Sequence, residues 1–143
     1  MARISILLVE DNEGDIVLTL EALQQSKLNN IIKVVRDGIQ AIQFLSREGK
    51  YKTESLPDLI LLDINLPKVD GKQVLSFIKN HEIYRSIPVI MLTTSTSEKD
   101  VMDSYKGHAN CYIAKPVDLN LFMEVVRSIE SFWFSIVQLP VKK

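Results

Sequence analysis

Apolar and polar positions along the chain follow two different periods. Short apolar runs are continuous instead of alternating with polar residues, which is typical of strands buried on both faces of a parallel sheet. The segments between them carry apolar residues three or four positions apart, which is typical of helices with one buried face. The runs that predict strands lie at roughly 4–9, 31–35, 58–63, 87–93 and 110–114.

A helical stripe follows each predicted strand, so the order is strand then helix, repeated five times. This alternation predicts an α/β fold with a five-stranded doubly wound parallel sheet, helices on both faces and right-handed crossovers. A turn at Asp37-Gly38 precedes the second helix, and Asp118 is a good N-cap for the last. The predicted stripes are Ile16, Leu20 and Leu23; Ile39, Ile42 and Leu45; Val74, Leu75 and Ile78, after Gly71; Val101, Met102 and Tyr105; and Phe122, Val125, Val126, Ile129 and Trp133.

Acidic residues stand where the first and third predicted strands end. Glu10 and Asp11 directly follow the first strand, and Asp63 closes the third. In open parallel sheets the carboxyl ends of the strands share one edge, and ligands bind there at the topological switch point. With the strand order 2-1-3-4-5 the first and third strands are neighbours, so we expect the three carboxylates to converge.

Three converging carboxylates repel one another unless a cation compensates their charge. Mg²⁺ takes oxygen ligands, usually one or two carboxylates completed by waters and phosphate oxygens. The two histidines, His81 and His108, lie far apart in sequence and Cys111 is the only cysteine, so no zinc-type spacing is present. The cluster therefore favours Mg²⁺, with Mn²⁺ as a substitute, over zinc. The alternative is that these acids are solvated turn residues.

Two further strand ends carry groups that bind phosphate. The fourth predicted strand ends on Thr93 and Thr94, and the fifth ends on Lys115. A hydroxyl and an ammonium at the same edge as the acids can hold the oxygens of a phosphoryl group. Taken singly, Thr93 could be an ordinary strand residue and Lys115 a surface lysine. Their succession at neighbouring strand ends is what indicates phosphoryl chemistry.

As an ordered set, these motifs resemble the receiver domains of two-component response regulators, the CheY-like phosphoacceptor modules. The resemblance spans roughly residues 4–130 and implies a flavodoxin-like (βα)5 fold. The segment IESFWFSIVQLP (129–140) is further similar to single-domain regulators that partner bacterial and cyanobacterial phytochromes. The motifs that carry the main resemblance are LLVEDN (7–12), PDLILLDINLPKVDG (57–71), IPVIMLTTS (87–95) and NCYIAKP (110–116).

The resemblance implies roles for the residues at the carboxyl edge. Asp63 matches the nucleophile that takes a phosphoryl group from a phosphohistidine. Asp11 matches the direct Mg²⁺ ligand, Glu10 an outer acid that acts largely through water, and Asn65 the residue whose backbone carbonyl binds the metal. Lys115 matches the lysine that pairs with the phosphoryl group.

The resemblance also implies a conformational switch. Thr93 matches the switch hydroxyl and Tyr112 the aromatic rotamer switch, although a half-buried strand tyrosine fits the sequence equally well. The peptide bond before Pro116 is expected to be cis. Receivers usually carry a very small residue after the switch hydroxyl. Thr94 is bulkier, so we expect it to narrow access to Asp63 and to affect the phosphorylated lifetime.

The implied function is that of a single-domain response regulator. It would accept a phosphoryl group from a sensor histidine kinase, a phytochrome among the candidates, and would signal to a downstream protein by contact or phosphorelay. It would not be an enzyme beyond its own phosphorylation and dephosphorylation. We expect residues 1–143 to form one receiver domain, with a core at 4–130 and a C-terminal helix extension and tail at 131–143.

Composition narrows the partners and the compartment. The net charge of −1 gives no electrostatic footprint for nucleic acid or an anionic membrane, and no apolar run reaches the roughly 20 residues of a membrane span. With a single cysteine and no secretory signal, the cytoplasm is the expected compartment. The aromatic tail, with Phe132, Trp133 and Phe134, predicts a homodimer. The alternative is a tail folded back over its own domain.

Three other interpretations fit parts of the pattern. An aspartyl-phosphate hydrolase generally has a second acid two residues after the nucleophile, where this chain has Asn65. A flavodoxin-like binder of flavin mononucleotide needs a phosphate cradle after the first strand, where this chain has Glu10 and Asp11. A degenerate receiver would serve only as an interaction module, but the five chemical positions are all occupied here.

Overall fold

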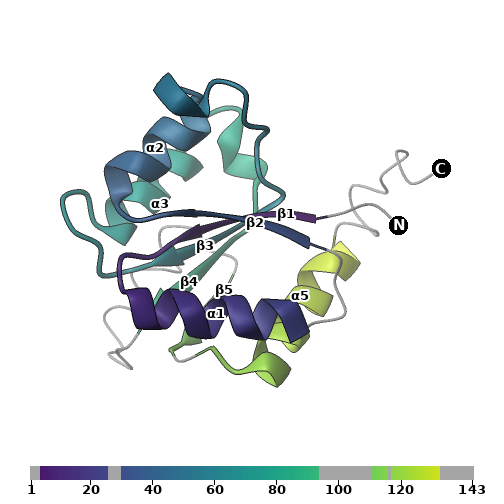
Figure 1. Cartoon of the computed structure of the whole chain (residues 1–143). Coiled ribbons are helices and arrows are strands. Elements are labelled where there is room, and N and C mark those ends of the chain that lie inside the picture. Colours follow the sequence, from purple (N-terminus) through teal and green to yellow (C-terminus); the bar gives the residue numbers. More distant parts are fainter. Residues whose placement is uncertain (1–3, 26–29, 94–110, 116, 133–143) are drawn as a thin grey trace.

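The computed structural model describes residues 4–25, 30–93, 111–115 and 117–132, with the backbone alone for 126–132. Within them a five-stranded sheet has the order β2-β1-β3-β4-β5, and its paired strands are parallel (Figure 1). The predicted fold class and strand order are therefore confirmed. The strands are β1 (Ile4–Val9), β2 (Asn30–Val35), β3 (Leu59–Asp63), β4 (Val89–Thr93) and β5 (Cys111–Ala114).

Helices cover both faces of the sheet. Figure 1 shows α1 and α5 on one face and α2 and α3 on the other. The predicted stripe at Val101, Met102 and Tyr105 lies outside the described residues. The helices are α1 (Glu13–Gln25), α2 (Gly38–Ser46), α3 (Gly71–Lys79) and α5 (Leu119–Phe132), with short 3-10 turns η1 (Gly49–Tyr51) and η2 (Tyr84–Ser86).

Each face of the sheet has its own core, which explains why the strand runs are apolar without alternation. Along β1, Leu7 and Val9 pack in the cluster that includes α2 and α3, whereas Ile6 and Leu8 pack in the cluster that includes α1 and α5. All four side chains are fully buried. Burial of such side chains stabilises a fold by about 1.5–3 kcal/mol each, so the strand ends are held by a rigid scaffold.

The apolar stripes predicted for three of the helices face these cores. Those of α1 and α3 and the first part of the stripe of α5 are buried or half-buried, as expected. The later positions of the α5 stripe lie outside the described side chains. The confirmed positions are Ile16, Leu20, Leu23, Val74, Leu75, Ile78, Phe122 and Val125.

The buried face of α2 differs from the predicted stripe. Leu45 is buried as expected, but Ile39 is 41% exposed and Phe44 is buried in its place. The reason lies at Gly38, where an added Cβ would lie 2.0 Å from the carbonyl oxygen of Val69 in the loop before α3. Because this close approach requires a glycine facing inward, it fixes the rotation of the helix and turns the next residue outward.

Side-chain caps fix where the helices begin. The Asp118 carboxylate accepts a backbone N–H of the first turn of α5 at 3.0 Å, as predicted. Asp70 and Gln73 form a reciprocal capping box at the start of α3. Asn12 caps α1, since its Oδ1 accepts the backbone N–H of Asp15 at 2.9 Å. These caps start α1 and α3 shortly after β1 and β3, at the edge where the acidic residues lie.

Candidate functional site

Polar side chains gather where the strands end at one edge of the sheet. β1 is followed by Glu10 and Asp11, β3 and β4 end on Asp63 and Thr93, and β5 is followed by Lys115. Three of these side chains are almost completely buried, with exposed fractions of 0% for Glu10, 2% for Asp63 and 0% for Thr93. Charged and polar groups this deeply buried need partners, so their surroundings define the site.

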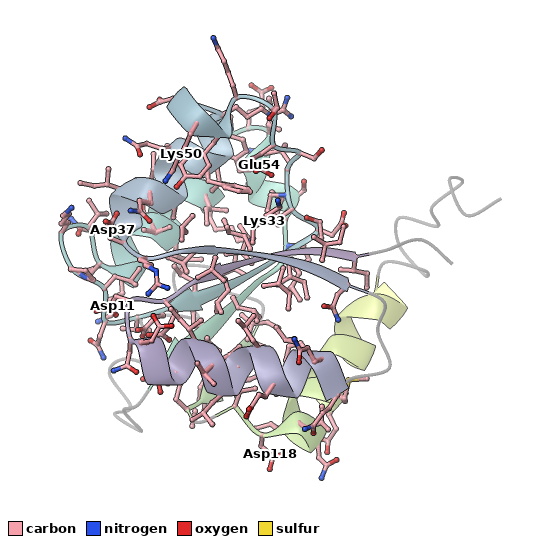
Figure 2. All side chains as sticks on the ribbon, in the orientation of Figure 1. Asp11, Lys33, Asp37, Lys50, Glu54 and Asp118 are labelled. Carbon is pink, nitrogen blue, oxygen red and sulfur yellow. The ribbon has the colours of Figure 1, made fainter. Side chains whose placement is uncertain are left out.

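The carboxylates of Glu10, Asp11 and Asp63 converge, as the strand order predicts. One oxygen from each residue lies within 4.8 Å of the others. Asp11 is the exposed member of the three, and Figure 2 shows it at the end of the sheet near the start of α1. Among the described residues, this oxygen-only set is the one group of acids, histidines and cysteines that could hold a metal ion. A hard divalent cation suits such a set.

The Lys115 ammonium lies in the middle of the acids. Its Nζ lies 3.0 Å from Glu10 Oε1, 2.9 Å from Asp15 Oδ2 and 3.2 Å from Asp63 Oδ2. The lysine side chain is only 6% exposed. Even with this cation, four carboxylates, including Asp11, share the edge with a single ammonium, so the described site carries excess negative charge.

That excess changes the proton affinity of the buried groups. Burial raises the pKa of Glu10 from 4.5 to about 7, and the hydrogen bond and charge of Asp63 add to the rise. Hydrogen bonds from Lys115 and from the backbone N–H of Asn12 act in the opposite direction. Burial alone would lower the pKa of Lys115, but its bonds to Asp15 and Glu10 and the charge of Asp63 raise it. Below about pH 7 the metal-free site therefore favours a proton on Glu10, which a bound cation would displace.

This proton makes cation binding depend on pH. We expect the affinity for Mg²⁺ to fall as the pH drops below about 7, by about tenfold per pH unit at the steepest, because binding then releases one proton. In the metal-free protein the raised pKa of Glu10 gives a contribution to stability that is fully present below about 4.5 and is lost as the pH rises through about 7. Metal titrations at pH values on both sides of 7 measure the effect. The Glu10→Gln variant should bind more weakly but with a flatter pH profile, and an equally flat wild-type profile would contradict the assignment.

The backbone around Asp63 is packed against the start of α3. The backbone N–H of Asn65 donates to Asp63 Oδ1 at 3.1 Å, and the N–H of Gly71 donates to the carbonyl of Ile64 at 2.9 Å. A Cβ at Gly71 would lie 2.1 Å from the carbonyl oxygen of Asp63 and 2.7 Å from Cα of Ile64. Since no side chain fits there, the glycine lets α3 begin directly against the residue that ends β3.

The two residues predicted to act as a switch lie on β4 and β5. Thr93 is fully buried, and its carbonyl accepts the backbone N–H of Lys115 at 2.7 Å, which ties the end of β5 to β4. Tyr112 is half-buried and packs against the core cluster on the α2 and α3 face. Both positions suit the predicted roles, and the simpler role of Tyr112 as a strand tyrosine fits equally well.

Several predicted residues fall outside the described part of the chain. They are Thr94, Pro116, Trp133 and Phe134, so the cis peptide bond and the aromatic dimer surface remain predictions from the sequence. Phe132 ends α5, but only its backbone is described.

Asp15 and Gly71 belong to the site, yet the sequence patterns did not indicate them as site residues. Asp15 lies in the first turn of α1. Acids are common there because they suit the helix dipole, so an acid at this position does not indicate a functional site. Gly71 follows the cap residue of α3 and looks like an ordinary helix boundary. The available signal was positional, because both residues begin helices that directly follow an acid-bearing strand end.

Comparison with known proteins places the chain in a family. Residues 6–127 match the response regulator receiver domain. The chain belongs to this family. The receiver domain is 46% identical over 135 residues to response regulator Rcp1 of Synechocystis sp., a similarity that covers 94% of this chain and 92% of Rcp1. The predicted resemblance to receiver domains is thus confirmed.

Solved structures of response regulators are similar to the receiver domain over nearly its whole length. The phosphorylated cyanobacterial phytochrome response regulator RcpA is 48% identical, with a TM-score of 0.79 and coverage of 94% of this chain and 96% of RcpA. The Mn²⁺-bound form of Rcp1 is 45% identical, with a TM-score of 0.77 and coverage of 96% of this chain and 99% of Rcp1. These neighbours confirm the flavodoxin-like receiver fold and place the chain among homologues of phytochrome response regulators.

The family assignment identifies the receiver domain as a signalling protein of a two-component system. Its acidic cluster is suited to a divalent metal ion. None of the helices in the described part of the chain combines the length and the apolar character that crossing a membrane requires.

Proposed function

We propose that this receiver domain accepts a phosphoryl group on Asp63 from the phosphohistidine of a sensor histidine kinase, with Mg²⁺ as the metal and Mn²⁺ as a substitute. The observation that carries the proposal is the position of Asp63. Its buried carboxylate lies 3.2 Å from the Lys115 ammonium and within 4.8 Å of oxygens from two further acids. A carboxylate can form an acyl phosphate, and cations around it offset the charge that the phosphoryl group brings.

The contacts of Asp63 suggest which oxygen reacts. Oδ1 accepts the backbone N–H of Asn65, whereas Oδ2 accepts the ammonium of Lys115. We expect Oδ2 to supply the electron pair for the new bond to phosphorus, while the bond to the imidazole nitrogen breaks and its electron pair stays with the kinase histidine. The Lys115 donor then turns to a phosphoryl oxygen and remains protonated.

The metal would be held by oxygen atoms of Asp11 and Asp63, with Glu10 acting largely through water and with the backbone carbonyl of Asn65. A bound divalent cation supplies positive charge that offsets the carboxylates and the phosphoryl oxygens. Support comes from the chemistry of this donor set and from Rcp1, a relative with a Mn²⁺-bound structure.

Phosphorylation would act on a two-state element. The phosphoryl group adds negative charge beside the buried Thr93, whose hydroxyl is proposed to move onto a phosphoryl oxygen, with Tyr112 following. The changed surface would signal to a downstream protein by contact or by phosphorelay.

We further propose that residues 1–143 form one receiver domain, that the protein forms a homodimer through its C-terminal tail, and that it is located in the cytoplasm.

The test of this function is phosphorylation by a small donor. With acetyl phosphate and Mg²⁺ the protein should gain the mass of one phosphoryl group, and the product should be sensitive to hydroxylamine because it is an acyl phosphate. A chelator should prevent the reaction, since the acids then repel the donor. A hydroxylamine-resistant label, or equal labelling with the chelator present, would contradict the proposal.

The kinase partner can be narrowed by transfer from phosphorylated histidine kinases. The RcpA relative is a phytochrome response regulator, so we expect a phytochrome kinase to transfer faster than kinases with other sensors. A matched panel of kinases at equal phosphohistidine concentration measures this preference. Faster phosphoryl transfer from a kinase with another sensor would contradict the phytochrome as the partner kinase, but it would still support Asp63 as the phosphoacceptor.

A further inference from the structure

One of the three acceptors of Lys115 lies outside the proposed metal set. An ammonium has three N–H donors, and Lys115 directs them at Glu10, Asp15 and Asp63, with N–O distances of 2.9–3.2 Å. Glu10 and Asp63 also belong to the convergent carboxylates, whereas Asp15 does not. The shortest of the three contacts, at 2.9 Å, is the one to Asp15.

We propose that Asp15 is a positioning residue for phosphoryl transfer, which anchors the Lys115 ammonium beside Asp63 while the other two carboxylates change partners. This inference rests on the proposed phosphoacceptor role of Asp63. It adds a function for a residue of α1 that neither binds the metal nor receives the phosphoryl group.

The exchange of partners during transfer is what creates the need for an anchor. When Asp63 Oδ2 becomes bonded to phosphorus, it loses its negative charge and the Lys115 donor that it accepted turns to a phosphoryl oxygen. Glu10, one of the acids that would hold a divalent cation, would turn toward that cation at the same edge. Asp15 takes part in neither change, so its bond to Lys115 can persist from the free protein to the phosphorylated one.

The surroundings of Asp15 hold its carboxylate in place. Its backbone N–H is capped by Asn12 Oδ1 at 2.9 Å, and the next residue, Ile16, is buried in the core with 3% exposure. The Asp15 side chain is 26% exposed, whereas the Lys115 side chain is 6% exposed. The bond is therefore charge-assisted and largely sheltered from water, which are the conditions in which such bonds are strongest.

The opposite role would also be conceivable for an acid at this place, because Asp15 could hold Lys115 back and repel the phosphoryl group. The two roles predict opposite signs. Removal of an anchor slows phosphorylation, whereas removal of a competitor speeds it. The three contacts of Lys115 favour the anchoring role. Lys115 can give up its bond to Asp63 and donate to a phosphoryl oxygen while it keeps its bond to Asp15.

The experiment is a double-mutant cycle on the rate of phosphorylation. Asp15→Asn keeps the size of the side chain and removes its charge, and Lys115→Ala removes the group on which it is proposed to act. With acetyl phosphate at saturating Mg²⁺, we expect Asp15→Asn to slow phosphorylation by about tenfold, as for one charge-assisted hydrogen bond. In the Lys115→Ala background the same substitution should change the rate by less than about twofold, because the partner is absent.

Glu13→Gln is the matched control. Glu13 lies in the same turn of α1 and carries the same charge, but its carboxylate pairs with Arg36 at 2.7 Å and its side chain is 70% exposed. Its substitution removes one negative charge near the site without touching Lys115, and the rate should stay within about twofold of wild type. Asp15→Glu should recover part of the lost rate, because a longer side chain can still offer a carboxylate oxygen.

A second measurement does not depend on turnover and applies if Lys115→Ala is too slow to follow. With Mg²⁺ and beryllium fluoride as a phosphoryl mimic, NMR should resolve two different Hε protons on Lys115 when its side chain is held in one conformation. We expect them to be distinct in wild type and in Glu13→Gln and averaged in Asp15→Asn.

The inference is overturned if Asp15→Asn is phosphorylated at the wild-type rate or faster, or if it slows the reaction equally in both Lys115 backgrounds. Distinct Hε protons in Asp15→Asn would overturn it as well. A wild-type protein that accepts no phosphoryl group would instead remove the proposed function, and this inference with it.

Discussion

Asp63→Asn is expected to abolish phosphorylation while leaving the fold intact. An amide is a poor nucleophile of nearly the same shape, and its oxygen can still accept the N–H of Asn65, which lies 3.1 Å from Asp63 Oδ1. The side chain lies at the end of a strand that is buried along its whole length. Intact mass after treatment with acetyl phosphate and Mg²⁺ measures the loss, and denaturant unfolding checks the fold.

Asp58→Asn provides the matched control for this prediction. Asp58 precedes β3 and lies at its opposite end, where its carboxylate accepts the backbone N–H of Ser5 at 2.9 Å. Asp58 is the same residue type as Asp63 and flanks the same strand, but it lies at the end of β3 that is remote from Lys115. This variant should take up one phosphoryl group at the wild-type rate. Undiminished labelling of Asp63→Asn, or an equal loss in both variants, would mean that another residue is the acceptor.

Gly71→Ala should damage the site through the backbone and should destabilise the fold. The added Cβ would meet the Asp63 carbonyl oxygen at 2.1 Å and Ile64 Cα at 2.7 Å, both well inside van der Waals contact. Either α3 moves away from the sheet or the end of β3 is displaced. Overpacking of this kind typically costs about 1–3 kcal/mol, and displacement of Asp63 should slow phosphorylation in the molecules that remain folded.

Gly38→Ala separates the two effects of Gly71→Ala. Its Cβ would approach the Val69 carbonyl oxygen to 2.0 Å, a clash of similar severity that involves the loop before α3 and not Asp63 itself. Both variants should unfold at lower denaturant concentration than wild type. Only Gly71→Ala should also lose phosphorylation rate under conditions in which both are folded. Equal rates in the two folded variants would show that Gly71 has no specific influence on Asp63.

The acidic edge could be predicted from sequence because it depends on strand order and on strand ends alone. The alternation of strands and helices allows few topologies, and the short apolar runs show closely where the strands end. Together these two features predict the convergence of Glu10, Asp11 and Asp63. The buried face of α2 could not be predicted in the same way. Ile39 fits a helical stripe as well as Phe44 does, and the choice is made by the close contact of Gly38 with another loop.

Asp15 shows a different limit of the sequence pattern. Whether an acid at the start of a helix points into solvent or toward a distant lysine depends on how that helix is set against the sheet. Here the cap by Asn12 and the burial of Ile16 turn Asp15 toward the carboxyl edge, and its partner Lys115, which directly follows β5, is 100 positions away. No local pattern contains that information, because the contact forms only when the folded chain brings the start of α1 next to the residue after β5.

The long reach of Lys115 has a consequence for the protein while it is being made. Lys115 lies 105 positions after Glu10 and 52 after Asp63. Translation at about 5–20 residues per second leaves roughly 3–10 s between the synthesis of the proposed phosphoacceptor and that of its counterion. During this interval the ribosome-bound chain carries the acids of the site without the lysine that balances them. On the proposed mechanism, competence to receive a signal is therefore reserved for chains in which nearly the whole receiver has left the ribosome.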